Sequence, residues 1–225
     1  MKRYVDLHVK PSDEKTIHDI LETALKLGYS TVGLAAGEIP RRSIEEYSGL
    51  KVLKRIDADA KLDGLREYRM KLSERCDLVS AICRDSSDIR RALKFGFNLL
   101  CFKGLPQTPR ITDFSLIGAS EAYLELDVYD LLSFERDERV AIFRAIARIF
   151  RYASRKKVKL IIASGATDAY KLRAPLDLAS MVLPAGITWG EALTATIHNP
   201  LLLLSRVIGK GRGYISEGVR TVGRW

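Results

Sequence analysis

The chain has 225 residues, 47% hydrophobic and 29% charged, so it is long enough for one well-buried domain and unlike a disordered protein. Lysine and arginine total 37 against 28 aspartate and glutamate residues, which gives a formal net charge of +9. Such a surplus of positive charge favours a polyanionic partner such as nucleic acid, although many basic proteins bind none.

Short runs typical of β-strands alternate with longer amphipathic runs along almost the whole chain. Strands are expected at residues 4–9, 31–36, 51–59, 78–83, 98–102, 122–128 and 158–164. Helices are expected at 13–27, 62–75, 86–95, 112–119 and 134–156, with two or three more between 173 and 206. This alternation predicts a parallel sheet with helices on its faces, and the short links favour a closed barrel over an open sheet.

The predicted fold is therefore α/β, a single-domain TIM-like (β/α) barrel. We expect the barrel to occupy residues 1–205 and a basic, flexible tail to occupy 206–225. The cysteines Cys76, Cys83 and Cys101 lie among apolar neighbours and never form a C-x-x-C pair, which is typical of reduced thiols in the core of a cytoplasmic protein. No apolar run approaches the roughly 20 residues of a membrane span, so no membrane partner is expected.

The first predicted strand, YVDLHV, contains two potential metal ligands. Asp6 and His8 are two residues apart and therefore point to one face of a strand. The strand resembles that of the polymerase-and-histidinol-phosphatase phosphoesterases, which begin D-L-H-x-H and bind a cluster of metal ions. Here Lys10 stands at the second histidine position, and the remaining histidines are His18 and His198. A cluster built mainly from imidazoles cannot be assembled from these residues.

Two interpretations of this strand stay open. In the first, Asp6 and His8 form hydrogen bonds at the barrel mouth and bind no metal. In the second, Asp6 binds Mg²⁺ with carboxylates from later strands, Asp57, Asp59 and Asp127, and the chain is a free-standing metal-dependent phosphoesterase that uses Asp6 and His8. The small number of histidines favours the first interpretation, so we expect no metal and no cofactor bound by this chain.

Cationic side chains follow most of the predicted strands. Binding groups of a barrel gather at the carboxyl ends of its strands. The cations found there are Lys10, Arg41, Arg42, Arg84, Lys103, Arg110, Lys171 and Arg173. A barrel mouth, where the carboxyl ends of the strands meet, that is lined by cations is suited to binding phosphate groups. A hydrolase would need histidines and carboxylates there.

The most informative stretch is residues 159–206. A strand leads into SGA, the segment LRAPLDLASM follows, and an NP pair precedes the last apolar helix. Together with DLHV near the start, this pattern resembles the archaeal ribonuclease P protein component 3 family, which is related to the thirty-kilodalton subunit of the eukaryotic nuclear enzyme. The resemblance covers essentially the whole chain. It implies a barrel related to the phosphoesterases above but without their metal centre.

The same resemblance implies a function. Members of this family belong to the ribonucleoprotein that removes the 5′ leader of precursor tRNA, together with ribonuclease P protein component 2 and other protein subunits. The RNA subunit carries the catalytic site and the Mg²⁺, and the two proteins support the catalytic domain of the RNA. We therefore expect no catalytic residue in this chain, no activity of the isolated chain, and contacts with RNA and protein partners.

Two features of the SGA…LRAPLD segment allow alternative roles. Ser164 and Gly165 could bind phosphate through backbone N–H groups, or could form a tight turn that requires glycine. The planar guanidinium of Arg173 could bind a phosphate through two hydrogen bonds, or could pair with Asp177. Ser164 and the tail residue Arg212 complete the predicted RNA-binding set, with Arg41, Arg42, Arg84, Lys103, Arg110, Lys171 and Arg173.

The long helix expected at 134–156 carries a narrow stripe of arginines at i, i+4, i+7 and i+11: Arg144, Arg148, Arg151 and Arg155. The residues predicted to face the barrel from the opposite side are Phe143, Ile146, Ala147 and Phe150. Like charges in a row repel one another unless an acidic surface or RNA covers them. The stripe is therefore predicted to contact RNA or a partner protein, unless acids of the neighbouring helices neutralise it.

Overall fold

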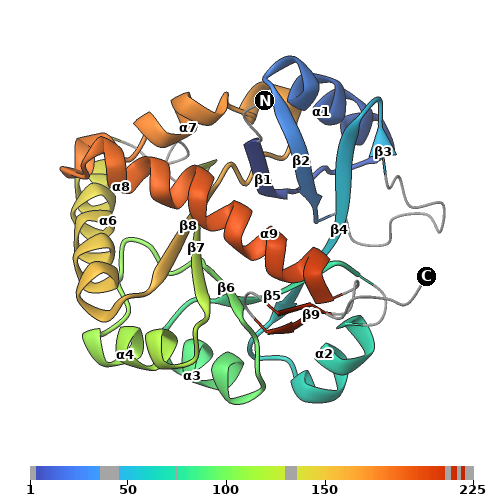
Figure 1. Ribbon diagram of the computed structural model, residues 1–225. Helices are drawn as coiled ribbons and strands as arrows, with labels where there is room; N and C mark the ends of the chain where they lie inside the picture. The colour runs from blue at the N-terminus through green and yellow to red at the C-terminus, as the bar shows by residue number, and fades with distance from the viewer. Residues whose placement is uncertain are drawn as a thin grey trace.

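The computed structural model describes residues 4–35, 46–73, 76–129, 136–210, 214–216 and 219–220. Its centre is an eight-stranded sheet that curves into a barrel with helices around it (Figure 1). The strands are β1 (Tyr4–Val9), β2 (Tyr29–Leu34), β3 (Glu46–Tyr47), β4 (Leu50–Asp59), β5 (Leu78–Cys83), β6 (Leu99–Phe102), β7 (Tyr123–Asp127) and β8 (Lys159–Ala163). The predicted α/β barrel of TIM-like type is confirmed.

The sheet follows the order β1-β2-β4-β5-β6-β7-β8, and all neighbours on this path are parallel. The two-residue strand β3, which the sequence pattern did not predict, pairs antiparallel with the start of β4. Such a short strand carries no alternation that a sequence pattern could reveal. Because helices cover the outside of the barrel, both faces of a strand are buried, as all four residues of β6 illustrate.

The helices lie close to the predicted ranges. They are α1 (Glu14–Lys26), α2 (Leu65–Ser73), α3 (Ser86–Lys94), α4 (Ile111–Ala119), α6 (Arg136–Lys156), α7 (Pro175–Ser180), α8 (Trp189–Leu193) and α9 (Asn199–Lys210). Short turns connect the last of them: η1 (Ala169–Lys171), η2 (Leu183–Ala185) and the π-helical η3 (Thr194–His198). Side-chain caps fix the helix starts, as where Asp13 accepts a hydrogen bond of 2.7 Å from the Thr16 N–H.

The barrel closes between its first and last parallel strands only near their carboxyl ends. There the Gly165 N–H donates to the His8 carbonyl at 2.9 Å, and the Lys10 N–H donates to the Ala166 carbonyl at 2.7 Å. A single parallel bridge joins Val9 to Ala166. The loop after β8, which contains the SGA sequence, is therefore the seam of the barrel.

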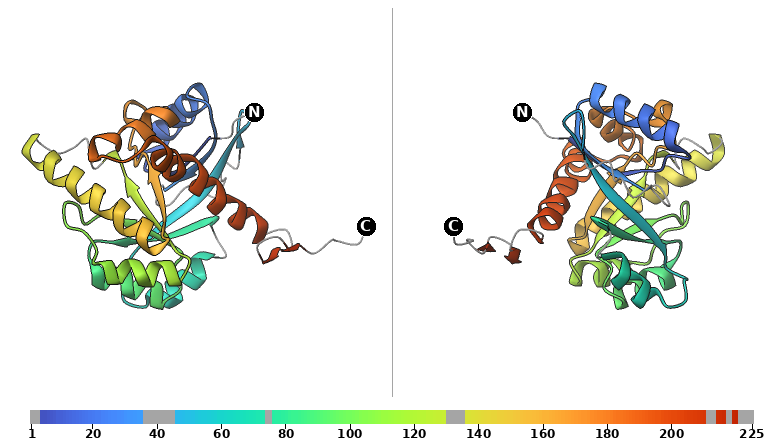
Figure 2. Two further views of the ribbon diagram at one scale, coloured as in Figure 1. Left: turned by 60° about the vertical axis from the view of Figure 1, so that its left-hand side comes forward. Right: turned by 90° about the vertical axis from the view of Figure 1, so that its right-hand side faces the viewer.

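Helix α9 closes the opposite end of the barrel, where the strands begin (Figure 1 and Figure 2). Its residues Leu203 and Leu204 are buried against the apolar side chains at that end: Val5, Leu7, Leu53, Leu78, Leu99, Tyr123 and Ile161. The side chain of Asn199, the first residue of α9, donates a buried hydrogen bond of 2.7 Å to the Leu160 carbonyl. The predicted division between barrel and tail at residue 205 falls inside α9, which continues to Lys210. Beyond it, β9 (Tyr214–Ser216) and β10 (Val219–Arg220) form an antiparallel pair.

Candidate functional site

The Asp6 and His8 side chains have separate partners at the barrel mouth. The pairing of β1 with β2 shifts register between Asp6 and Val9, which interrupts the regular alternation of the strand. The Asp6 Oδ1 atom accepts hydrogen bonds from the backbone N–H groups of His8 at 3.1 Å and Ser164 at 3.2 Å. Asp6 therefore stabilises the seam through hydrogen bonds at the barrel mouth, which the first interpretation of this strand expects.

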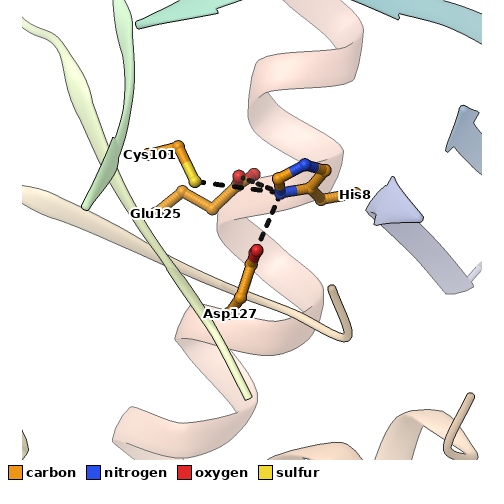
Figure 3. A group of neighbouring side chains, drawn as sticks. All are labelled: His8, Cys101, Glu125 and Asp127. Atoms are coloured by element: carbon orange, nitrogen blue, oxygen red, sulfur yellow. Dashed lines mark hydrogen bonds and ion pairs between the residues drawn. The ribbon is translucent and has the colours of Figure 1, made fainter. Parts of the chain in front are cut away.

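The imidazole of His8 lies at the centre of a buried group of acids (Figure 3). Its Nδ1 atom is 2.9 Å from Asp127 Oδ1, 3.1 Å from Glu125 Oε1 and 3.8 Å from the Cys101 sulfur. Its Nε2 atom is 2.8 Å from Asp57 Oδ2. Strands β1, β4, β6 and β7 thus each direct a polar side chain into one small volume near the seam.

A fully buried arginine on β4 neutralises two of these acids. The Arg55 Nε donates to Asp57 at 2.7 Å, and the two terminal nitrogens donate to Glu125 at 2.6 and 2.8 Å. The remaining donors reach the Leu7 carbonyl at 2.8 Å and the Ser80 hydroxyl at 3.1 Å. All five N–H groups of the guanidinium therefore have acceptors, which is the condition under which a buried charge is tolerated.

Two lysines neutralise the third acid from the solvent side. Lys10, just after β1, lies 2.9 Å from Asp127 Oδ2, and Lys103, just after β6, pairs with the same oxygen. The two side chains are 29% and 19% exposed, while Asp127 is buried. We call the seven residues the central ion cluster: His8, Lys10, Arg55, Asp57, Lys103, Glu125 and Asp127.

The cluster fixes the charge of its members. Burial and the nearby Arg55 oppose a charged imidazole, but Asp127 and Asp57 raise the pKa of His8 well above its ordinary value. Burial likewise opposes ionisation of Asp127, yet His8, Lys103 and Lys10 hold its pKa well below the ordinary range. Burial raises the pKa of Cys101 to about 11, so its thiol stays protonated at neutral pH. The described part of the barrel mouth therefore contains fixed charges of alternating sign, and its Cys101 thiol is not an activated nucleophile.

The donor set bears on the metal question directly. One ligand atom from each of His8, Cys101, Glu125 and Asp127 lies within 4.8 Å of the others, so the group has the dimensions of a metal site. However, a metal needs free lone pairs on these ligands. Lys10 and Lys103 already direct their positive charge at Asp127, and acids lie against both ring nitrogens of His8. The residues as they stand do not fit a resident metal ion, and Asp59 lies apart, bound to Arg84.

The buried Asp6 leads to a prediction about pH. Burial raises the pKa of Asp6 to about 6, against 3.8 ordinarily, although hydrogen bonds from Ser164 and His8 offset part of the effect. The folded protein thus keeps this proton to a higher pH than the unfolded chain. The stabilisation from Asp6 is complete below about pH 4 and is lost as the pH rises through 6.

Asp6→Asn, which cannot titrate, should therefore gain stability relative to the unsubstituted chain between pH 4 and pH 7, by about 3 kcal/mol. Urea unfolding at several pH values in this range measures the difference. Asp19→Asn, on the exposed side of α1, is the matched control for loss of a carboxylate. A stability difference for Asp6→Asn that stays constant across the range would contradict the prediction.

The SGA sequence has a structural role in the seam. The N–H groups of Ser164, Gly165 and Ala166 donate to Asp6, to the His8 carbonyl and to the Ser164 hydroxyl, respectively. Ser164 is only 1% exposed. These N–H groups are already used within the seam and Gly165 has a φ of +62°, which agrees with a turn that requires glycine, while the RNA contact of Ser164 stays a prediction.

Several predicted RNA-binding cations have partners within the protein. Lys103 pairs with Asp127, as above, and Arg84 binds both oxygens of Asp59 at 3.0 Å on the surface. Lys171 donates to Thr167 at 2.7 Å, pairs with Asp168 at 2.9 Å and lies over the Tyr129 ring. The Arg173 guanidinium donates to the carbonyls of Tyr170 and Leu172, rather than to Asp177.

Arg110 is exposed at the start of α4. Arg41, Arg42 and Arg212 lie outside the described residues. Several cations that the sequence predicts to contact RNA therefore form ion pairs with acids of the same chain.

The arginine stripe of α6 is on the surface, as predicted. Arg144, Arg148, Arg151 and Arg155 are exposed, while Ile146 and Phe150 are buried on the opposite face, with Phe143 and Ala147 half-buried beside them. Among the described residues, none of the four arginines forms an ion pair, and Arg148 donates to the Thr108 hydroxyl at 3.3 Å. Within the described structure the stripe is therefore a line of positive charge without paired acids.

A groove of about 340 Å³ runs beside the C-terminal half of this stripe. It lies between α6 and the segment from η2 to α8, and Arg151, Ser154 and Arg155 line one wall. The one acid in the lining, Glu191, accepts hydrogen bonds from the N–H and hydroxyl of Thr188 as a helix cap. Among the described residues, Glu191 forms no ion pair with the arginines of the stripe.

Glu125 and Arg55, the two most deeply paired charges of the site, are not among the predicted site residues. A signal for both was present. Each is a charged residue in the middle of an apolar strand, KVLKRIDAD or AYLELDV, and a charge buried in a barrel interior needs a partner of opposite sign.

In the described part of the chain no helix has both the length and the hydropathy of a membrane span.

The family model for RNase P subunit p30 matches residues 3–210 of the chain. The chain belongs to the RNase P subunit p30 family. This confirms the resemblance found in the sequence and makes the chain a ribonuclease P protein subunit, while the alternative of a free-standing phosphoesterase is not supported. Family membership agrees with the central ion cluster, in which cations pair with the described acids Asp57, Glu125 and Asp127.

Two curated relatives are similar over nearly their full length. Ribonuclease P protein component 3 of Methanosarcina barkeri is 23% identical, over 96% of this chain and 93% of the relative. Ribonuclease P protein component 3 of Methanococcoides burtonii is 22% identical, over 96% of this chain and 91% of the relative. Both relatives are named as ribonuclease P proteins, as the p30 family is, and both match this chain over nearly its full length.

Solved structures support the fold. A chain from the cryo-EM structure of archaeal ribonuclease P with mature tRNA matches with a TM-score of 0.76 at 15% identity, and the match covers 98% of each chain. An amidohydrolase matches with a TM-score of 0.62 at 14% identity, over 93% of this chain and 74% of the enzyme. The p30-family barrel therefore shares its architecture with hydrolases, although its mouth carries the central ion cluster.

Proposed function

We propose that this chain acts within an archaeal-type ribonuclease P as an RNA-binding and partner-binding subunit, without taking part in bond cleavage. The observation that carries the proposal is the arginine stripe of α6: four exposed guanidiniums without acidic partners among the described residues. Such a line of charge is costly to maintain unless a polyanion covers it. Arg110 and Arg173 at the mouth provide further positive charge.

The proposed partners are the ribonuclease P RNA and ribonuclease P protein component 2, with other protein subunits present and precursor tRNA as the substrate of the assembly. The cations would neutralise phosphates and so let two RNA segments approach each other, which lowers the Mg²⁺ concentration that the RNA needs. The proposal places the catalytic Mg²⁺ on the RNA, leaves the isolated chain inactive, and assigns the protein, with its free cysteines, to the cytoplasm.

Reconstitution tests this proposal. The RNA subunit and its other protein subunits are assembled with and without this chain, and cleavage of precursor tRNA is followed across a range of Mg²⁺ concentrations. We expect omission of the chain to shift the Mg²⁺ requirement upwards, and the chain alone to cleave nothing. Equal cleavage at low Mg²⁺ with and without the chain would refute the proposal.

The stripe makes a sharper prediction about salt. Arg151→Ala combined with Arg155→Ala should weaken binding to the ribonuclease P RNA and reduce the slope of log affinity against log salt by about 1.4–1.8, since each phosphate contact contributes about 0.7–0.9. Fluorescence anisotropy at several KCl concentrations measures the slope.

Arg84→Ala is the matched control for this measurement, because Arg84 is also exposed but is already bound to Asp59. Its slope should change much less than that of the double variant. If the double variant had the same slope as the unsubstituted chain, the stripe would not contact the RNA. A protein partner would then be its expected contact.

A further inference from the structure

We propose that the ammonium groups of Lys10 and Lys103 stand in for a divalent metal ion at a latent four-ligand site, and that removing both opens the site to Zn²⁺ and Co²⁺. The ligands of the latent site are His8, Cys101, Glu125 and Asp127. This inference is independent of RNA binding, because it concerns only the buried interior of the mouth.

The geometry of the ligands is the first support. Their donor atoms lie within 4.8 Å of one another, as in a site built around one ion. The set of one nitrogen, one sulfur and two oxygens is a combination that Zn²⁺ and Co²⁺ accept. All four side chains are buried and come from β1, β6 and β7, so neighbouring parallel strands rather than mobile loops hold them in place.

The charge balance is the second support. Lys10 and Lys103 both direct their ammonium groups to one oxygen, Asp127 Oδ2, and together carry the two positive charges of a divalent ion. Without them, the three acids Asp57, Glu125 and Asp127 face one permanent cation, Arg55, so the cluster lacks two positive charges when His8 is the neutral imidazole that a metal requires. The lysines thus supply the charge that a metal would supply in a site of this shape.

The path to solvent is the third support. The two lysine side chains are 29% and 19% exposed, whereas their acid is completely buried, so they fill the opening between the cluster and solvent. Shortening or neutralising both would give an ion a route to the ligands. Arg55 can remain, because carboxylates that bind metals commonly accept a hydrogen bond from a second group as well.

The test compares the unsubstituted chain with Lys10→Met/Lys103→Met, both stripped of metal and titrated with Co²⁺. We expect the double variant to bind one Co²⁺ per chain and to develop a sulfur-to-cobalt charge-transfer band, and its Tm to rise with Zn²⁺. The unsubstituted chain should show none of these changes. Adding Cys101→Ser to the double variant should remove the sulfur band.

Lys94→Met/Lys156→Met is the matched control, since it removes two exposed lysines that lie away from the mouth, and it should bind no Co²⁺. If the double variant unfolds without metal but folds with Zn²⁺, the proposal is supported, since the ion then replaces the lost charge. A folded double variant that binds no more Co²⁺ than the unsubstituted chain would overturn it. So would a double variant that stays unfolded with Zn²⁺, or an unsubstituted chain that binds Co²⁺ equally well.

Discussion

Arg55→Met should lower the free energy of unfolding by about 3–5 kcal/mol, because it leaves the buried acids Asp57 and Glu125 without their main counter-charge. It also removes the donors to the Leu7 carbonyl and the Ser80 hydroxyl. Urea unfolding at pH 7 measures the change. Burial of Arg55 opposes its charged form, yet the two acids raise its pKa well above the ordinary value, so its charge is an integral part of the folded state.

Two controls separate buried charge from general loss of an arginine. Arg84→Met also breaks a two-bond arginine–aspartate pair, but on the surface, and should change stability by at most about 1 kcal/mol. Arg55→Met/Glu125→Leu removes both members of the buried pair and should recover part of the loss. If Arg55→Met cost no more than Arg84→Met, the central ion cluster would not be the support of the mouth that the geometry indicates.

Gly165→Ala should destabilise the fold by about 2–5 kcal/mol. Gly165 has a φ of +62°, a conformation that costs an alanine about 1–2 kcal/mol. In addition, an added Cβ would lie 2.7 Å from the Cβ of Asp127 and 2.8 Å from its Cγ. Asp127 cannot move aside, because His8, Lys10 and Lys103 hold its carboxylate, and overpacking of this kind costs about 1–3 kcal/mol more.

Gly28→Ala is the control for this second prediction. Gly28 also has a positive φ, +84°, but an added Cβ there would meet nothing within 4 Å. It should therefore show the conformational cost alone, and the difference between the two variants isolates the contact with Asp127. Thermal and urea unfolding measure both. Equal effects at Gly28 and Gly165 would mean that the seam tolerates a side chain, contrary to the structure.

The fold could be predicted from the sequence because its strands are short apolar runs separated by amphipathic helices. In a barrel covered by helices, burial on both faces makes each strand apolar throughout. The strand predicted at residues 78–83 accordingly has the same bounds in the structure. The position of α9 could not be predicted in the same way. The apolar face of α9 indicates that this helix packs against the barrel. The end of the barrel on which it packs depends on the three-dimensional path of the chain.

The site was predicted in part, for a reason that the lysines illustrate. The sequence places Lys10 and Lys103 after strands, and therefore at the mouth, which is where they lie. It does not reveal that both turn inward to Asp127 instead of outward to a phosphate. Ion pairs between residues far apart in the chain, such as Arg55 with Glu125, depend on which strands are neighbours across the barrel interior. The alternation of strands and helices along the chain does not reveal which strands face each other across the barrel.

The position of α9 has a consequence for how the protein is made. The helix that covers the apolar end of the barrel is synthesised after every strand of the main sheet. Domains generally begin to fold from the N-terminus while translation continues. Until α9 has left the ribosome, a nascent barrel would expose the apolar side chains of Leu78, Leu99 and Tyr123, so this is the stage at which it most needs a chaperone.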